Sequence, residues 1–160
     1  MGWDDAEAAA ARYPGLVDHP FPTCFSCGTD RGDGLGLRPG AVPGRPGTVA
    51  ASWVPHASTT DDGSVVTRQV TWAALDCPGG WSVDIVGRPM VLGTMTARLD
   101  ALPRAGRRHV VVGRADGEQG RRTFTSTALY DVEGAEPVLL GRAAAVWVRV
   151  DPATLTPSAG

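Results

Sequence analysis

The folds that this sequence can adopt are limited by one apolar segment near the middle of the chain. All the regular segments that follow it look like β-strands. Residues 66–85 read VTRQVTWAALDCPGGWSVDI, and from Val70 onward apolar side chains recur at helical spacing on nearly every face. This pattern is typical of a buried helix rather than a surface helix. Thr67 is the expected N-cap, and Pro78, which lacks an amide hydrogen, is expected to end or kink the helix.

Four segments after this helix are predicted to form β-strands. They are apolar or β-branched and are separated by turns rich in glycine or charge. Strands so close in sequence are expected to pair antiparallel. One buried helix against one antiparallel sheet is a two-layer α+β arrangement, for which 160 residues suffice. The four predicted strands are residues 90–102, 108–114, 122–131 and 138–150.

The first part of the chain is less regular. Residues 4–13 predict a short helix, and residues 48–54 (TVAASWV) predict a strand. Between them, residues 19–47 are rich in proline and glycine, which predicts a long irregular segment with at most one short strand near residues 35–38. So long a loop in a compact domain usually has a function or packs on itself. We therefore expect an N-terminal helical extension (residues 1–17), the main domain (residues 18–152) and a flexible tail (residues 153–160).

Composition narrows the possible functions. The chain is 42% hydrophobic and 20% charged, as in ordinary globular proteins, and its net charge of −2 leaves no basic footprint for nucleic acid. No stretch approaches the roughly 18 apolar residues of a membrane span, and the acidic start lacks the basic region of a secretory signal, so we expect a cytoplasmic protein. All 15 basic residues are arginines, so the chain offers no lysine for Schiff-base chemistry.

Two stretches and the order of elements carry a family resemblance. The order resembles that of the hot-dog fold, in which a curved antiparallel sheet wraps around a long helix. Residues 72–81 (WAALDCPGGW) resemble the central helix of the PaaI-like acyl-CoA thioesterases, where a carboxylate follows a small apolar run and precedes small residues and an aromatic one. Residues 22–28 (PTCFSCG), with residues 34–37 (GLGL), resemble the entry segment of a hot-dog subgroup associated with actinobacteria. The resemblance spans residues 20–150.

The resemblance implies a thioesterase-like protein that acts on acyl-CoA or an acyl-carrier protein. It also implies a homodimer or higher homo-oligomer with the site between subunits, and no cofactor other than coenzyme A as part of the substrate. Asp76 would be the catalytic base or nucleophile. Where the family usually has His-Gly-Gly, this chain has Thr67-Arg68-Gln69, and amides near Gln69 would hold the carbonyl oxygen. The expected substrate-binding residues are Arg68, Thr71, Trp72 and Trp81.

Other interpretations of these residues remain open. The missing His-Gly-Gly favours a non-catalytic protein that binds an acyl thioester or another hydrophobic small molecule. A hot-dog dehydratase or hydratase is a further alternative, although that chemistry usually pairs a histidine with a carboxylate and no histidine lies near Asp76 in sequence. Arginines at the predicted turns match the phosphates of coenzyme A, but solvated turn charges explain them more simply. These arginines are Arg104, Arg107, Arg108, Arg121 and Arg122.

The pair Cys24-x-x-Cys27 allows a redox or a metal interpretation. A redox pair normally begins a helix, and no helical pattern follows Cys24. A zinc site needs four ligands, and although Cys77, His19 or His56 could complete one, the spacing is not diagnostic. We therefore predict no metal site, and we interpret Cys24 and Cys27 as small apolar side chains that anchor the loop and Cys77 as a buried, inert thiol.

Overall fold

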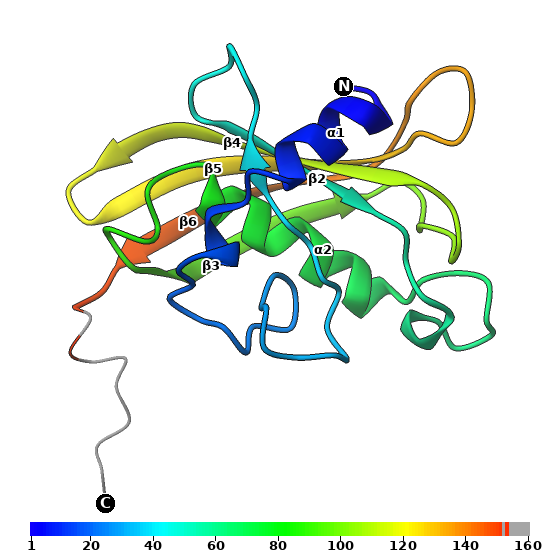
Figure 1. The fold of residues 1–160 in the computed structure, drawn as a ribbon, viewed down its shortest axis with the longest axis horizontal. Coiled ribbons are helices and arrows are strands. Elements are labelled where there is room, and N and C mark those ends of the chain that lie inside the picture. The colour runs from blue at the N-terminus through cyan, green and yellow to red at the C-terminus, as the bar shows by residue number, and fades with distance from the viewer. Residues whose placement is uncertain (152, 154–160) are drawn as a thin grey trace, which may run out of the picture.

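A six-stranded antiparallel sheet packs against one face of helix α2 (Arg68–Trp81) in the computed structural model, which describes residues 1–151 and 153 (Figure 1). The strands are β1 (Gly40–Ala41), β2 (Thr48–Trp53), β3 (Met90–Leu99), β4 (His109–Gln119), β5 (Arg122–Asp131) and β6 (Val138–Arg149). Their order in the sheet is β1-β2-β4-β5-β6-β3. The predicted α+β hot-dog architecture is confirmed.

The predicted strands form, but their pairing departs from chain order at one place. Strands β4, β5 and β6 pair with their sequence neighbours as expected. Strand β3 pairs with β6 instead of β4, and β4 lies between β2 and β5. The expectation that all close neighbours pair is therefore wrong for β3. The connection from β3 to β4 runs past the start of α2, where Arg104 forms an isolated bridge with Val65.

The prediction of a short strand near residues 35–38 is wrong. The amides of Leu35 and Leu37 donate to the carbonyls of Phe25 and Ser26 (2.8 and 3.0 Å), so this stretch bonds to its own loop and not to the sheet. The sheet instead begins two residues later with β1. A short sequence pattern does not show which partner an extended backbone will find, because that partner lies elsewhere in the chain.

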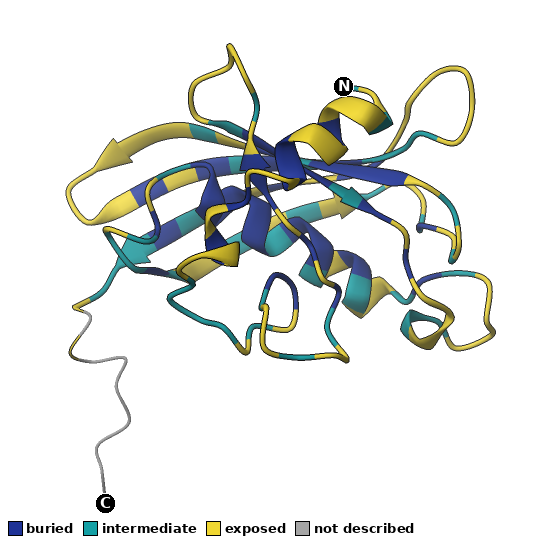
Figure 2. Cartoon of the chain, viewed as in Figure 1, coloured by how far each residue is buried: buried dark blue, intermediate teal, exposed yellow. Residues whose placement is uncertain are grey.

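Helix α2 continues through Pro78 to Trp81, so of the two expected effects of the proline, an end or a kink, the end does not occur. A proline removes one helical hydrogen bond and crowds the preceding turn. Here the sheet supports that part of the helix, because the buried Thr127 hydroxyl donates to the Leu75 carbonyl (2.8 Å). Burial is dense at this end of the helix, since every residue from Cys77 to Trp81 is buried (Figure 2).

The start of α2 matches the sequence prediction, whereas the first helix begins one residue earlier and ends three residues earlier than the predicted range 4–13. The Thr67 hydroxyl accepts a hydrogen bond from the Val70 amide (3.3 Å), which confirms the predicted N-cap of α2. Helix α1 (Trp3–Ala10) packs its buried alanines against Ala50 and Val110 on the outer face of the sheet. Two short 3-10 turns, Pro14–Leu16 and Ala57–Thr59, lie between the two α-helices.

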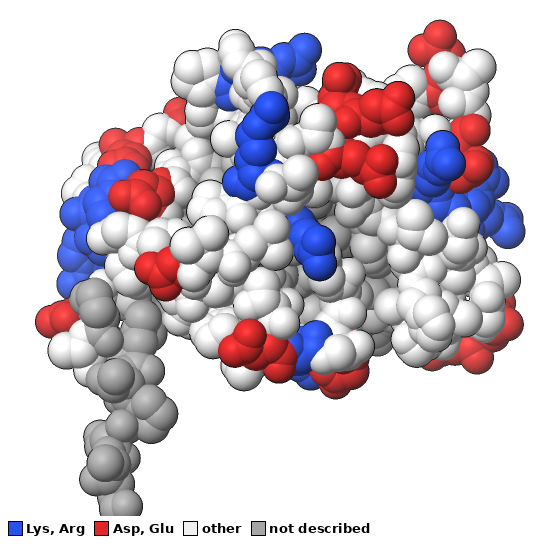
Figure 3. All heavy atoms as spheres, in the orientation of Figure 1, with Lys and Arg blue, Asp and Glu red and all other residues white. Residues whose placement is uncertain are grey.

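The surface shows no concentration of one charge sign in the view of Figure 3, where acidic and basic side chains are interspersed around uncharged areas. None of the helices in residues 1–151 is both long and apolar enough to cross a lipid bilayer. Of the predicted flexible tail, residues 154–160 lie outside the described residues.

Candidate active site around Asp76

The irregular segment before the sheet folds over the side of α2 that faces away from the strands (Figure 1). We call its residues 19–30 the cysteine loop. The Ser26 hydroxyl of this loop donates to the Ala73 carbonyl of α2 at 2.8 Å. The indole nitrogen of Trp81 donates to the Cys27 sulfur at 3.3 Å. The predicted long loop therefore packs on the central helix, and it encloses the helix turn that carries Asp76.

Asp76 is a half-buried carboxylate with an unused oxygen. Its Oδ1 atom is buried and has no hydrogen-bond partner among the described residues. Burial is the main cause that raises the pKa of Asp76 to about 6, and the nearby charge of Cys24 raises it further. A buried carboxylate without a partner costs stability, and such groups concentrate at functional sites. Among the described residues, the buried Oδ1 atom of Asp76 has neither the amide partners nor the arginine partner that a structural role would require.

A pocket of about 170 Å³ opens beside Asp76, between the cysteine loop, α2 and the first residues of β3. Its walls are mostly aromatic and aliphatic, with Phe21, Ile85 and Leu92 among them. Polar groups are few and include Asp76 and His19. An apolar pocket with a small number of convergent polar groups is the usual form of a small-molecule site. This pocket is therefore our candidate for the place where a substrate's reacting group would lie.

Of the six predicted site residues, Asp76 and Trp81 line the pocket and the other four do not. Arg68 and Gln69 are exposed at the start of α2, up to two turns before Asp76. Trp72 precedes Asp76 by one helical turn, so the two lie on the same side of α2, and Trp72 is 36% exposed. Thr71 is fully buried, and its hydroxyl donates to the Thr67 carbonyl at 2.9 Å.

Three thiols and a histidine line the same pocket as Asp76 and were not assigned to the site from sequence. The sulfur atoms of Cys24, Cys27 and Cys77 all lie within 4.8 Å of one another, and all three cysteines are free. Hydrogen bonds from the Cys27 and Cys77 thiols lower the pKa of Cys24 to about 2. The bond to Cys24 is in turn the largest cause that raises the pKa of Cys27, to about 12. The sequence signal was the Cys-x-x-Cys-Gly pattern together with a third cysteine next to Asp76.

His19 is held in place from both ring nitrogens. Its Nδ1 accepts a hydrogen bond from the Phe21 amide at 2.9 Å. Its Nε2 lies 3.1 Å from the Cys27 carbonyl oxygen, to which it can then donate. The rings of Tyr13 and Trp81 contact the imidazole edge to face, at centroid distances of 6.0 and 5.1 Å. Burial lowers the pKa of His19, which favours a neutral ring in the pocket wall.

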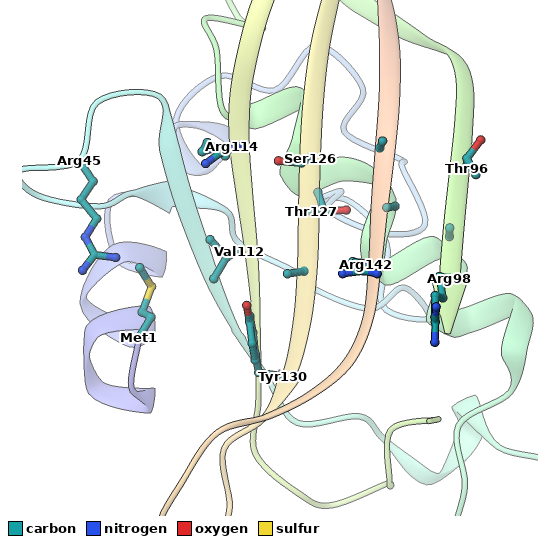
Figure 4. A pocket seen from close by; sticks show the side chains of 14 residues that line it. Met1, Arg45, Thr96, Arg98, Val112, Arg114, Ser126, Thr127, Tyr130 and Arg142 are labelled. Carbon is teal, nitrogen blue, oxygen red and sulfur yellow. The ribbon is translucent and has the colours of Figure 1, made fainter. Parts of the chain in front are cut away.

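A second, wider hollow of about 700 Å³ lies on the outer face of the sheet, beside α1 (Figure 4). Arg98, Arg114 and Arg142 border it, together with Tyr130. Arg98 and Arg114 each form an ion pair with a neighbouring aspartate. The hollow contains no acid or thiol among the side chains that line it, so we prefer the smaller pocket at Asp76 as the site of chemistry. The turn arginines, for which phosphate binding was the less simple of two interpretations, line neither of these two hollows; they are Arg104, Arg107, Arg108, Arg121 and Arg122.

Comparison with known proteins identifies the fold. No protein-family model matches the sequence, and no curated protein sequence matches it. Among solved structures, zebrafish thioesterase superfamily member 2 superposes with a TM-score of 0.64 and 14% identity, over 91% of this chain and 98% of that one. The PaaI protein from the phenylacetic acid degradation operon of Escherichia coli gives 0.62 and 9%, over 73% and 81%. A Streptococcus mutans protein solved with acetyl-CoA gives 0.57 and 9%, over 66% and 83%. The chain therefore has the hot-dog fold that these structures share.

Proposed function

We propose that this protein binds an acyl thioester in the pocket beside Asp76 and hydrolyses it with that carboxylate. The observation that carries the proposal is the buried, unpartnered Oδ1 atom of Asp76 at the edge of an apolar pocket. The fold supports it, since the structural neighbours include thioesterase-superfamily proteins and one that was solved with acetyl-CoA. Coenzyme A or an acyl-carrier protein would be the leaving thiol.

In the proposed reaction, Asp76 accepts a proton from a water molecule as the water oxygen attacks the thioester carbonyl carbon. The carbon–sulfur bond then breaks, and the leaving thiolate takes the proton from Asp76, which restores the carboxylate and releases the free thiol. Direct attack by the carboxylate, with later hydrolysis of the anhydride, is the other route open to such a group. In both routes the carbonyl oxygen becomes negatively charged and needs hydrogen-bond donors.

The proposed donors are amides near Gln69, and their position makes a homodimer part of the proposal. Gln69 precedes Asp76 by seven residues, which places them about 10 Å apart along one helix axis. One helix therefore cannot present both groups to the same carbonyl. A second copy of the chain would have to supply the start of its α2, with Arg68 and Thr71 nearby, so that the acyl chain runs past Trp72 and Trp81.

Strand β3 offers the edge through which such a dimer could form. It is ten residues long, lies at the end of the sheet, and has mostly exposed or half-buried residues. A long unpaired edge strand tends to pair with another chain unless something covers it. Met90, Val91 and Leu92 of this strand also line the Asp76 pocket, so a partner on this edge would lie beside the pocket. Analytical ultracentrifugation of the wild type and of Thr94→Pro tests this interface, and the variant is expected to be monomeric.

The hydrolysis is tested with a panel of acyl-CoAs of increasing chain length, by following release of free thiol. We expect turnover by the wild type and a loss of at least about 100-fold in Asp76→Asn, which keeps the shape but cannot accept the proton. Asp61→Asn, which changes an exposed aspartate in a loop, is the matched control and should keep full activity. If the wild type cleaves no substrate faster than Asp76→Asn, hydrolysis by Asp76 is wrong.

A non-catalytic binding protein is a second candidate, favoured by the exposed Arg68 and Gln69 side chains where related enzymes carry glycines. Calorimetry with a non-hydrolysable acyl-CoA analogue separates the two. Binding without turnover of the matching thioester would favour the binding protein, and absence of binding would count against both.

A hydratase or dehydratase is a third candidate because the fold brings a histidine to the carboxylate. His19 and Asp76 line one pocket although 57 positions separate them in the sequence. An acid–base pair can add water to an enoyl thioester, but both ring nitrogens of His19 are engaged here, so this activity requires the imidazole to release its bond to the Cys27 carbonyl. Incubation with enoyl-CoAs tests this activity, which would be seen as a loss of the absorbance of the conjugated double bond.

We also propose a cytoplasmic location and a relationship to the actinobacterial hot-dog subgroup, on the sequence features given above.

A further inference from the structure

Three cysteines from two distant parts of the chain converge on one point in the wall of the pocket. The sulfur atoms of Cys24 and Cys77 are 3.4 Å apart, and the sulfur of Cys27 lies within 4.8 Å of both. Cys27 and Cys77 are buried, and Cys24 is half-buried. Three inert apolar anchors would not need to point their sulfur atoms at a common centre, so the convergence itself requires an explanation.

The backbone of the cysteine loop is built to hold two of these sulfurs. The Gly28 amide donates to the Cys24 carbonyl (2.9 Å), which closes a tight turn around the pair. A β-carbon at Gly28 would collide with the backbone of Pro22 and Cys24, so a glycine is required there. The Asp30 amide closes a second turn on the Pro22 carbonyl (2.9 Å). These bonds fix both cysteines before any ligand binds.

Hydrogen-bond donors are aimed at the sulfurs. The Nε2 atom of His19 lies 3.5 Å from the Cys27 sulfur. The Trp81 indole nitrogen donates to the Cys27 sulfur at 3.3 Å. A neutral thiol is a weak acceptor, whereas a thiolate gains from such donors. The Cys27 sulfur therefore has a donor that would stabilise it as a thiolate once a metal ion takes the place of the thiol proton.

We propose that Cys24, Cys27 and Cys77 bind a zinc ion, with the fourth coordination position open to the pocket that contains Asp76. Zinc bonds to thiolate sulfur at about 2.3 Å in a tetrahedron, which separates the sulfurs by about 3.8 Å. The observed separations, from 3.4 Å to under 4.8 Å, bracket that value. Binding would release the thiol protons to solvent as the three zinc–sulfur bonds form. Soft thiolate ligands favour zinc over magnesium or calcium.

His19 is not expected to fill the fourth position. Its Nδ1 accepts from the Phe21 amide, so in the neutral ring the proton lies on Nε2, which points to the Cys27 carbonyl. That nitrogen therefore has no free lone pair for a metal. The position remains for water or for an incoming ligand, and the unpartnered Oδ1 of Asp76 lines the same pocket and can accept a hydrogen bond from it. The metal site does not depend on the proposed thioesterase activity.

The first test measures metal content of the protein, purified without chelators and dialysed against zinc-free buffer. We expect roughly one zinc per chain in the wild type, and a loss of most of it in Cys27→Ser and in Cys77→Ser. His56→Gln changes an exposed histidine outside the cluster and should keep the metal. Wild type that binds no zinc even after addition of zinc salt, or serine variants that keep it, would overturn the proposal. Iron or copper in its place would also overturn it.

The second test uses wild-type protein alone, so it does not depend on folding of the variants. Reduced protein is treated with a thiol-alkylating reagent in the presence of zinc salt, of magnesium salt, or of a chelator, and modified thiols are counted by mass spectrometry. Protection of all three cysteines by zinc but not by magnesium is expected. Equal labelling in all three samples contradicts a zinc site. A disulfide between Cys24 and Cys77 that forms in air and persists with zinc present would assign the cluster to redox chemistry instead.

Discussion

Gly113 of β4 lies directly against Pro78 of α2, and a β-carbon at Gly113 would overlap the Pro78 carbonyl. This contact brings the helix turn next to Asp76 close to the sheet. We predict that Gly113→Ala lowers the free energy of unfolding by about 1–3 kcal/mol, because overpacking forces the helix away from the strands. Urea denaturation measures the change. Gly32→Ala, where no atom lies within 4 Å of the added carbon, should stay within about 0.5 kcal/mol of wild type.

The Ser26 hydroxyl connects the cysteine loop to α2, so its loss should loosen the loop more than the rest of the fold. Ser26→Ala removes the 2.8 Å bond to the Ala73 carbonyl and is expected to cost about 1 kcal/mol. Hydrogen exchange should rise in the cysteine loop, while the amides of β4 and β5 stay protected. Ser58→Ala, which changes an exposed serine beside His56, is the control. Equal exchange in the two variants would show that this bond does not hold the loop.

Ionisation of Asp76 should lower the stability of the folded protein as pH rises. Its pKa is about 6 in the folded state, compared with the ordinary aspartate value of 3.8 for the unfolded chain, so the native state binds the extra proton between these values. Stability therefore falls as pH rises through this window, and the cost is complete above about pH 6. In metal-free protein, Asp76→Asn is expected to be more stable than wild type near neutral pH by about 3 kcal/mol.

The stability gained by Asp76→Asn over wild type should shrink towards pH 4. There the wild-type carboxyl is protonated, so its side chain is neutral like that of asparagine. Urea denaturation at both pH values in the presence of a chelator measures the difference. A variant that is less stable than wild type at both pH values would mean that Asp76 has a structural partner, such as a group from a second copy of the chain.

His109 should make the protein sensitive to mild acid. It is fully buried, its Nδ1 lies 2.9 Å from the Arg107 carbonyl, and its Nε2 has no partner among the described residues. Burial is the main cause that lowers the pKa of His109 below 6.5. The unfolded chain therefore binds a proton that the native state rejects, and stability falls as pH drops below about 6.5.

As pH falls through the same range, protonation of Asp76 raises stability, which opposes the effect of His109. The contribution of His109 is therefore measured by comparing a His109 variant with wild type, since Asp76 is present in both. Replacing His109 by Asn should reduce the stability lost between about pH 7.5 and pH 5.5. His56→Asn, at an exposed position, should leave the loss unchanged. Thermal unfolding at the two pH values measures the loss of stability in each variant and in wild type. A loss as large in His109→Asn as in wild type would contradict the assignment.

Much of the fold was predictable from local patterns. Periodicity located α2 and five of the strands, because burial of one side chain face imposes its spacing on the sequence. The Thr67 cap was predictable for the same reason, since a cap and its helix are adjacent in the chain. The position of Asp76 on the buried central helix also followed from this local pattern, supported by the family resemblance.

The tertiary structure decided what depends on residues far apart in sequence. Helix α2 continues past Pro78 because the sheet supports it, through contacts such as Thr127 to Leu75, which no local rule contains. Strand β3 pairs with β6 because sheet order is a property of the whole chain. The same holds for the site. The sequence identified Cys24 and Cys27 as a pair and Asp76 as a carboxylate, but the folded chain brings Cys77 and His19 to them, because chemistry at a site depends on distances that sequence separation does not determine.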